Sequence, residues 1–426
     1  MRHKLLSAAM LLGLASHAHA LTDSVINAGL QLNFSNPGAR SLGMGGAFLG
    51  FSDDATAAYT NPAGLTNLAT AEVAYEWRQS SNAIPYVSGG EGSVAPDSST
   101  NLEFSDAEST IRGTRFFSFV QPFEHFTLAF YRHSLAEYDN IFVQNEVFVD
   151  SADDDLLARV FASSQGIQLS LINYGMSAGF KVGEKWSVGA GLAYSSLDFV
   201  AATVRERNAQ QPNAITEVAF GDDHALVFNL GLLYQMTDRW SFGAAYRRGG
   251  DFDLQYATLD PNTNAALAAG MTGFDVPHQI GIGVSYRPTD ALSIGFEANH
   301  VRYSRLSNDF DSIAFTVQNP TSRFDIGADD GTELRLGGEY VFANMSRPFS
   351  VRAGVWRDPD HRLAFQGPSP PADFGQAAAR VLFPDGDDEY HYSLGFGWAF
   401  ESFQLDAAAD LSDQVDTYTM SGVWRF

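Results

Sequence analysis

The stretch DTYTMSGVWRF, residues 416–426, ends the chain and carries its clearest structural signal. Every second position belongs to one set, which comprises Tyr418, Met420, Gly422, Trp424 and Phe426. Because successive side chains of a strand point to opposite faces, this spacing predicts a strand with one apolar face. Such a strand suits two architectures, the edge of a soluble sheet and the wall of a membrane-spanning barrel.

The same alternation recurs along the chain. It is seen in WSVGAGLAY (186–194), ALSIGFEAN (291–299), YHYSLGFGWAF (390–400) and FQLDAAADL (403–411). In each segment one face is apolar, with aromatic residues near its ends, and the other face is small or polar. A soluble sandwich would bury the apolar face against a second sheet, whereas a membrane barrel turns it towards lipid and keeps the polar face for its lumen.

The lengths of the connections decide between these architectures. Short connections at 122–125, 182–185, 236–239, 287–290, 343–348 and 400–402 alternate with long polar segments at 84–109, 138–163, 203–223, 252–275, 306–330 and 358–388, and the alternation ends at a final short link near 412–415. Short turns on one side and long loops on the other are typical of outer-membrane barrels. We therefore predict an all-β fold, a 14-stranded antiparallel transmembrane β-barrel over residues 70–426. Its strands are expected near 70–83, 110–121, 125–137, 164–182, 185–201, 224–236, 239–251, 276–287, 291–304, 331–343, 348–357, 389–400, 402–411 and 415–426.

Residues 1–20 read as a secretory signal peptide. A basic start at Arg2, His3 and Lys4 precedes a short apolar run, and Ala18-His19-Ala20 has the form of a cleavage site. An uncleaved anchor is the alternative. No other segment has the ~20 consecutive apolar residues of a membrane-spanning helix.

Composition excludes several classes of function. The formal net charge of −24 argues against a nucleic-acid partner, which requires a basic surface, and the absence of cysteine excludes disulfides and cysteine-based metal sites. The acidic runs lack the spacing of a calcium-binding loop, and we expect neither a metal nor a cofactor. The histidines have no recognisable catalytic partner and there is no Gly-x-Ser-x-Gly motif, so we predict that the chain is not an enzyme.

Residues 21–69 precede the first strand and do not alternate. Gly43, Gly45 and Gly46 permit close backbone approach and positive φ. Asp53 or Asp54 can cap a short helix through ATAAY (55–59), which Asn61-Pro62 then ends, because a residue before proline avoids the helical region. We predict that residues 21–69 form a hatch inside the barrel lumen, with a turn at Gly64 after the short helix. A soluble N-terminal tail is the alternative.

Three segments resemble the FadL/TodX (OmpP1) family of outer-membrane transporters of hydrophobic compounds. They are GARSLGMGGAFLGFSDDATAAYTNPAGLTNL (38–68), VPHQIGIGVSYRPTDALSIGFEANHVRYSRL (276–306) and LRLGGEYVFANMSRPFSVRAGVWRDPD (334–360). The hatch motif of the family is Asn-Pro-Ala, matched here by Asn61, Pro62 and Ala63. The resemblance implies passive uptake of long-chain fatty acids or aromatic hydrocarbons through a plugged barrel, with sideways exit near a kinked strand. A structural or secretion-accessory barrel without small-molecule transport is the rival function.

The resemblance also implies a location and partners. The terminal strand is similar to that of bacterial outer-membrane barrels, so Trp424 and Phe426 are the expected signal for the barrel-assembly machinery. We therefore expect a monomer in the Gram-negative outer membrane, in contact with lipid and lipopolysaccharide.

Charged residues are predicted to face the lumen. Strand parity directs Arg78, Arg335 and Arg352 inward, together with acidic residues that include Glu297 and Glu339. One interpretation is that an arginine binds the carboxylate of a fatty acid. The other, which the mixture of charges favours, is an ion-pair network that holds the hatch.

Two further features bear on a ligand path. The Ala-rich segments AALAAGMTGF (265–274) and FGQAAARVLF (374–383) are candidate helices, lying in outside loops, that either line an apolar pocket or pack on the rim. In the strand expected near 164–182, the apolar residues Ile167, Leu169 and Leu171 lie on one face. The apolar residues that follow, Ile172 and Tyr174, lie on the opposite face. An extra residue near 171–173 would turn both sets towards lipid, which predicts a β-bulge in that strand.

Overall fold

The computed structural model describes residues 34–93, 101–150, 158–160, 162–205, 215–260, 262–307, 313–314, 323–324, 326–369, 376, 380–381 and 383–426. Its helices are α3 (Ala39–Gly43), α4 (Ala57–Thr60) and the 3-10 helices η1 (Pro62–Asn67) and η2 (Tyr303–Ser307). The barrel strands are β1 (Glu72–Ser93), β2 (Asn101–Pro122), β3 (Phe126–Gln144), β6 (Ser163–Val182), β7 (Trp186–Arg205), β8 (Ile215–Thr237), β9 (Trp240–Arg247), β12 (Gln279–Tyr286), β13 (Leu292–Val301), β17 (Gly331–Phe342), β18 (Phe349–Asp358), β20 (Glu389–Ala399), β21 (Phe403–Leu411) and β22 (Val415–Arg425). The smaller strands are β4 (Val147–Asp150), β5 (Ala158–Val160), β10 (Asp251–Leu259), β11 (Ala266–Asp275), β14 (Ile313–Ala314), β15 (Arg323–Phe324), β16 (Ile326–Gly327) and β19 (Ala364–Phe365).

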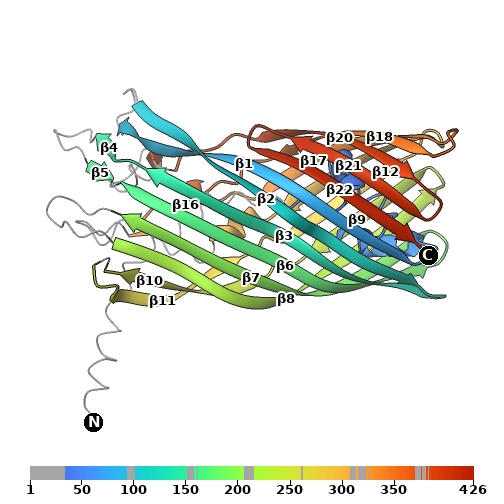
Figure 1. The fold of residues 1–426 in the computed structure, drawn as a ribbon, viewed down its shortest axis with the longest axis horizontal. Coiled ribbons are helices and arrows are strands. Elements are labelled where there is room, and N and C mark those ends of the chain that lie inside the picture. The colour runs from blue at the N-terminus through green and yellow to red at the C-terminus, as the bar shows by residue number, and fades with distance from the viewer. Residues whose placement is uncertain are drawn as a thin grey trace, which may run out of the picture.

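The barrel strands form one closed antiparallel wall (Figure 1). Each pairs with the next along the chain, and β1 pairs with β22 from Glu72↔Arg425 to Asn82↔Val415, which closes the ring. The predicted all-β, 14-stranded antiparallel barrel is confirmed. Closure leaves no unpaired sheet edge, as a wall surrounded by lipid requires.

The outer face of the barrel is apolar. Many large hydrophobic side chains of the strands are exposed there, among them Phe130, Leu192, Ile282, Leu394 and Met420. Aromatic pairs such as Trp186–Tyr234 and Trp240–Tyr286 stack near the short turns, with ring centroids 4.3 and 4.2 Å apart. This arrangement matches the apolar band and interfacial aromatic girdle of outer-membrane barrels. Among the described residues, no helix combines the length and apolar character needed to cross a bilayer.

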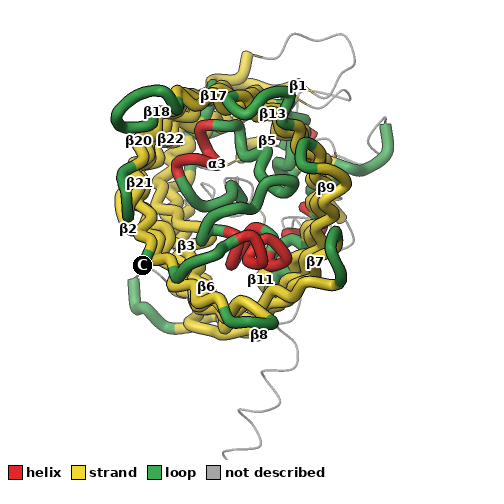
Figure 2. Tube along the Cα trace, turned by 90° about the vertical axis from the view of Figure 1, so that its right-hand side faces the viewer, coloured by secondary structure: helices red, strands yellow, loops and turns green. Residues whose placement is uncertain are grey.

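Residues 34–69 lie inside the ring of strands (Figure 2). Helices α3 and α4 and the 3-10 helix η1 contact the strands from within, near the end that carries the short turns. We call residues 34–69 the hatch segment. The expected signal peptide, and the hatch residues before 34, lie outside the described residues.

Several strands are longer than the sequence predicted. Strands β1 and β2 pair as far as Glu91↔Asn101, so most of the expected loop at 84–109 is wall. The predicted helix over 265–274 is also wrong: the segment forms β11, which pairs with β10. Backbone pairing with β10 and the burial of Phe274 outweigh the helical preference of the alanines in β11. The second Ala-rich segment lies mostly outside the described residues.

The bulge predicted in β6 is wrong as well. Strand β6 pairs with β7 in one unbroken register, and the extra residue is Leu135 of the neighbouring strand β3. The parity of β6 therefore never switches, and Ile167, Leu169 and Leu171 are buried on the lumenal side. Apolar residues that the sequence assigned to lipid thus face the interior of the barrel.

Candidate functional site

The Asn-Pro-Ala motif joins the hatch segment to the wall. Asn61 has an extended backbone, and its side-chain oxygen accepts a hydrogen bond from the Ala63 N–H (3.2 Å). Its amide donates to the carbonyl of Leu49 in the hatch (3.3 Å) and to that of Leu232 in β8 (3.1 Å). Pro62 begins η1, where a missing N–H costs nothing. Asn61 therefore ends one helix, caps the next and contacts the barrel.

Wall glycines allow this contact. A Cβ at Gly189 of β7 would overlap the backbone of Pro62 and Ala63, and one at Gly231 of β8 would overlap the Asn61 side chain. Within the hatch, Gly64 lies against Ser52. The lumenal face is flat here because its strands lack side chains where the hatch backbone lies against them.

The predicted hatch glycines lie against the opposite wall. Gly45 and Gly46 have φ of 63° and 75°. A Cβ at Gly43 would come within 2.9 Å of the Gly395 Cα, and one at Gly46 would overlap the Arg335 guanidinium. Side chains larger than hydrogen at these positions would push the hatch segment away from β17, β18 and β20.

The predicted lumenal arginines all pair with carboxylates. Arg78 contacts Glu76 at 2.7 Å, and Arg335 contacts Glu333 at 3.0 Å. Arg352 pairs with both Glu339 and Asp406 at 2.7 Å.

The same charges contact the hatch backbone. Glu297 accepts the N–H groups of Phe48 and Leu49 at 3.0 Å, and Arg335 donates to the Gly45 carbonyl (3.1 Å). Arg40 of the hatch reaches Glu339 at 2.9 Å. The arrangement is that of a network holding the hatch.

Between the hatch segment and the long-loop end of the barrel, the lining of the lumen is apolar. Strands β1, β2, β3, β6, β7, β8, β10, β11 and β13, together with η2, bury apolar side chains in one continuous cluster. It includes Ile167, Leu169, Leu171, Leu197, Phe199 and Phe252. We call this the outer apolar cluster.

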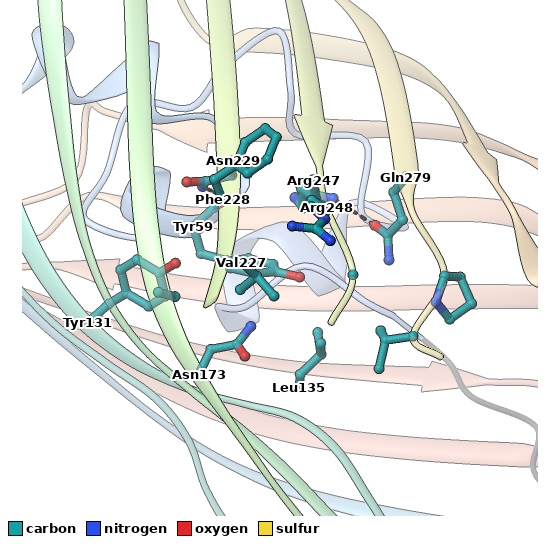
Figure 3. Close-up of a pocket in the computed structure, with 14 residues that line it drawn as sticks. Tyr59, Tyr131, Leu135, Asn173, Val227, Phe228, Asn229, Arg247, Arg248 and Gln279 are labelled. Atoms are coloured by element: carbon teal, nitrogen blue, oxygen red, sulfur yellow. Dashed lines mark hydrogen bonds between the residues drawn. The ribbon is translucent and has the colours of Figure 1, made fainter. Parts of the chain in front are cut away.

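A narrow pocket lies between the hatch segment and the outer apolar cluster (Figure 3). Tyr59 of the hatch, Tyr131 of β3, Asn173 of β6 and Val227 of β8 line it, and Arg247 at the end of β9 points into it. Burial raises the pKa of the Tyr59 phenol, which therefore stays neutral.

Arg247 differs from the predicted lumenal arginines. It is 8% exposed, and its guanidinium donates to Gln279 (3.0 Å) and to the Thr60 carbonyl (2.8 Å). No described carboxylate lies within the 4.0 Å of an ion pair, and its Nε has no hydrogen-bond partner among the described residues. A buried positive charge without an ion-pair partner is costly, so this pocket suits an anionic group.

Sequence reasoning missed Arg247, although a signal was present. Ser241 and Arg247 share one parity of β9, with Gly243 and Ala245 between them, and this is the small, polar face that the lumen takes. What the sequence does not reveal is which inward arginine lacks an acidic neighbour across the lumen.

Trp424 and Phe426 lie at the short-turn end of β22. Both are exposed on the outer face, and the Phe426 N–H donates to the Ala71 carbonyl at the start of the wall (3.0 Å). Their role as an assembly signal stays a prediction.

Among the described residues, no cluster of three or more His, Asp or Glu side chains is arranged to hold a metal ion.

Fold and site together define a class: a transmembrane β-barrel with an internal hatch and an apolar outer lumen. Residues 18–413 match the profile of the outer membrane protein transport protein family (OMPP1/FadL/TodX). The chain therefore belongs to this family, whose members are transport channels for hydrophobic compounds in the outer membrane.

Solved structures share the fold. A FadL homologue of Pseudomonas aeruginosa is 16% identical, with a TM-score of 0.66, and the match covers 93% of this chain and all of that one. The toluene transporter TodX of P. putida is 12% identical, with a TM-score of 0.59 and coverage of 92% and 99%. The monoaromatic hydrocarbon channel CymD is 17% identical, with a TM-score of 0.57 and coverage of 93% and 99%. No curated protein sequence matches the chain significantly.

Proposed function

We propose that the protein takes up hydrophobic carboxylates, such as long-chain fatty acids, passively across the outer membrane. The observation that carries the proposal is Arg247, a buried guanidinium without an ion-pair partner in the described lumen, placed directly beneath the outer apolar cluster. The acyl chain packs among the apolar side chains, and the carboxylate binds the guanidinium.

The electrostatics favour a carboxylate over a neutral hydrocarbon at this position. A hydrogen bond to a charged group contributes roughly 1.5–3 kcal/mol. That corresponds to about a tenfold to hundredfold preference over a ligand without the carboxylate. Arg78, Arg335 and Arg352 offer no such preference because each already has an acidic partner.

Transport needs release as well as binding. Uptake in this proposal is passive, so flux follows the concentration gradient and each site must bind weakly enough to let the ligand go. We further propose that the ligand leaves sideways through the wall, because the hatch segment occupies the lumen on the side of the short turns.

The test compares uptake of radiolabelled palmitate and of toluene by cells that carry the wild-type protein or Arg247→Met. Outer-membrane levels are matched by the amount of heat-modifiable barrel. We expect Arg247→Met to lower palmitate uptake about tenfold and to leave toluene uptake nearly unchanged. Arg112→Met, at an exposed arginine of β2, is the matched control. Equal palmitate uptake by Arg247→Met and wild type would refute the carboxylate assignment.

A broader test addresses transport itself. Cells that lack the protein, and any paralogue, should grow more slowly on a long-chain fatty acid. Normal growth and normal initial uptake over a panel of fatty acids and aromatic hydrocarbons would refute a transport role.

A further inference from the structure

Two arginines and a histidine stand side by side where three neighbouring wall strands reach the long-loop end. The last ladder pairs of β12 join Gln279 to Arg247 of β9 and to Val301 of β13. One position beyond these pairs, each of the three strands carries an arginine or a histidine. We call these residues the rim row: Arg248, His278 and Arg302. Backbone pairing extends to the row, because the Arg302 N–H donates to the His278 carbonyl (3.0 Å).

The rim row faces outward. The residues of the last ladder pairs, directly beside it in sequence, are buried on the lumenal side, and successive side chains of a strand point to opposite faces. The side chains of Arg248 and Arg302 are 41% and 56% exposed. The His278 ring meets the ring of Tyr246 edge-on, with centroids 6.3 Å apart. The row therefore lies on the lipid-facing side of the wall.

The height of the row along the wall matches the lipid headgroups. Arg248 is eight residues beyond Trp240, whose ring stacks on Tyr286 near the short turns. With a rise of about 3.3 Å per residue and a strand tilt of about 40°, eight residues span about 20 Å of membrane thickness, close to the ~25 Å of an apolar band. The row thus stands at the outer-leaflet edge of that band.

The side chains of the row keep unused hydrogen-bond donors. A guanidinium has five N–H donors, and Arg248 uses Nη2 to bind Asp251 (2.9 Å). The Arg302 guanidinium makes no hydrogen bond to a described residue, and its Nε lies 3.9 Å from Asp330. Most donors of the two arginines are therefore available to a group from outside the chain.

His278 adds a donor between the two arginines. Its Nδ1 accepts the Gly249 N–H (3.0 Å), so the neutral ring carries its proton on Nε2. The carboxylates of Asp251 and Asp275 near the row are both bound by Arg305, whose side chain is 15% exposed. The row is thus a line of donors with few acceptors of its own.

An arginine elsewhere on the rim differs in this respect. Arg357 lies at the long-loop end of β18, and its side chain is 35% exposed. Its Nε and Nη2 both contact Asp388, at 2.7 and 2.6 Å. Such a two-point pair satisfies the guanidinium within the chain. A place on the rim therefore does not by itself leave an arginine free.

We infer that the rim row binds the phosphate of a lipid headgroup in the outer leaflet, such as that of lipid A. A phosphate monoester carries up to two negative charges and three terminal oxygens, which arginine binds well. Neighbouring strands lie roughly 4.8 Å apart, so the backbones of Arg248 and Arg302 are about 10 Å apart, and both side chains reach a phosphate held over His278. The acyl chains then lie on Ile280 and Ile282, which are 54% and 62% exposed. The assignment goes beyond the proposed function and stands without it.

Lipid A binding tests the assignment. The detergent-solubilised protein is titrated with diphosphoryl lipid A, and native mass spectrometry measures the bound fraction. We expect Arg302→Gln to weaken the apparent affinity at least about fivefold, and Arg248→Gln/Arg302→Gln to weaken it further. Arg357→Gln is the matched control and should bind lipid A as wild type does. Each variant is measured as heat-modifiable barrel, so that only folded protein is compared.

A second arm uses wild type alone and varies the ligand. Lipid A stripped of its phosphates keeps its acyl chains, and we expect it to bind at least about tenfold more weakly. Inorganic phosphate in molar excess should not displace lipid A, because it lacks the acyl chains that contact Ile280 and Ile282.

The opposite results would overturn the assignment. Equal binding of intact and phosphate-free lipid A would show that the row does not recognise phosphate, and so would wild-type affinity in Arg248→Gln/Arg302→Gln. An equal loss of affinity in Arg357→Gln and Arg302→Gln would reduce the effect to general surface charge. Displacement of lipid A by inorganic phosphate would assign the row to a free anion and not to a lipid.

Discussion

The lumen has two halves of contrasting chemistry, although the same strands line both. Near the short turns, inward positions carry glycine, small polar residues and paired charges, and the hatch segment lies against them. Towards the long-loop end, inward positions carry Leu, Ile and Phe, which contact one another in the outer apolar cluster. The hatch half holds a polypeptide through directional contacts, whereas the outer half presents a continuous apolar lining.

The difference shows how each half is stabilised. Backbone N–H groups of the hatch need acceptors inside the barrel, and Glu297 supplies two such bonds. In the outer half, burial of apolar side chains is itself favourable and needs no directional partner. Disruption of the hatch half should therefore cost more per substitution, and four changes measure how firmly this half is held.

The largest effect is expected at Arg352. Its replacement by Met leaves Asp406 without its cation in the buried lumen, and breaking a buried ion pair typically costs about 3–5 kcal/mol. We expect a large drop in the temperature at which the folded barrel loses its heat-modifiable mobility on a gel. Arg112→Met, at an exposed site, should shift that temperature little. Equal shifts in the two variants would mean that the ion pairs do not hold the hatch half together.

Next in size is Gly189→Leu. The new side chain would overlap the backbone of Pro62 and Ala63, and overpacking of this kind costs about 1–3 kcal/mol when neighbours can move. We expect the hatch segment to be displaced and conductance in planar bilayers to rise several-fold. Gly166→Leu is the control, because nothing lies within 4 Å of a Cβ at Gly166. A closed channel in folded Gly189→Leu would contradict a fixed hatch.

A smaller effect is expected at Asn61. Its replacement by Ala removes the donors to Leu49 and Leu232 and leaves two buried carbonyls with fewer partners, a loss of about 1–3 kcal/mol. We propose that Asn61 and Pro62 act as a latch, so Asn61→Ala and the Asn61→Ala/Pro62→Ala variant should assemble but take up palmitate more slowly. Asn67→Ala is the control, since the Asn67 side chain makes one long contact of 3.5 Å. Wild-type uptake by the double variant would reduce the motif to a helix terminator.

The smallest effect concerns pH. Burial raises the pKa of the Asp54 carboxyl above its usual value of 3.8, although Arg40 and Thr56 oppose the shift. The folded hatch therefore binds a proton more readily than the unfolded chain, and its stability should rise slightly as the pH falls from neutral towards 3.8. Hydrogen exchange of hatch amides at pH 5 and pH 7.5 measures this, and Asp54→Asn should abolish the difference. Greater protection at pH 7.5 than at pH 5 in wild type, reversed by Asp54→Asn, would show the opposite linkage.

The sequence by itself determined the wall. Period-two alternation ending at Phe426, and the alternation of short and long connections, specify fourteen strands and their direction, because side-chain parity and turn length are local properties. The glycine-rich run before the first strand, with Asn61 and Pro62, likewise indicated the hatch.

Only the tertiary structure decided which parts of the lumen are apolar and which of its inward charges are paired. Parity shows that Ile167, Leu169 and Leu171 share a face, but an apolar face looks the same in sequence whether it contacts lipid or a ligand path. The partner of each inward charge is likewise set across the lumen by residues far away in the chain. For that reason the sequence drew attention to Arg78, Arg335 and Arg352, which are neutralised by acidic neighbours, and overlooked Arg247, which is not.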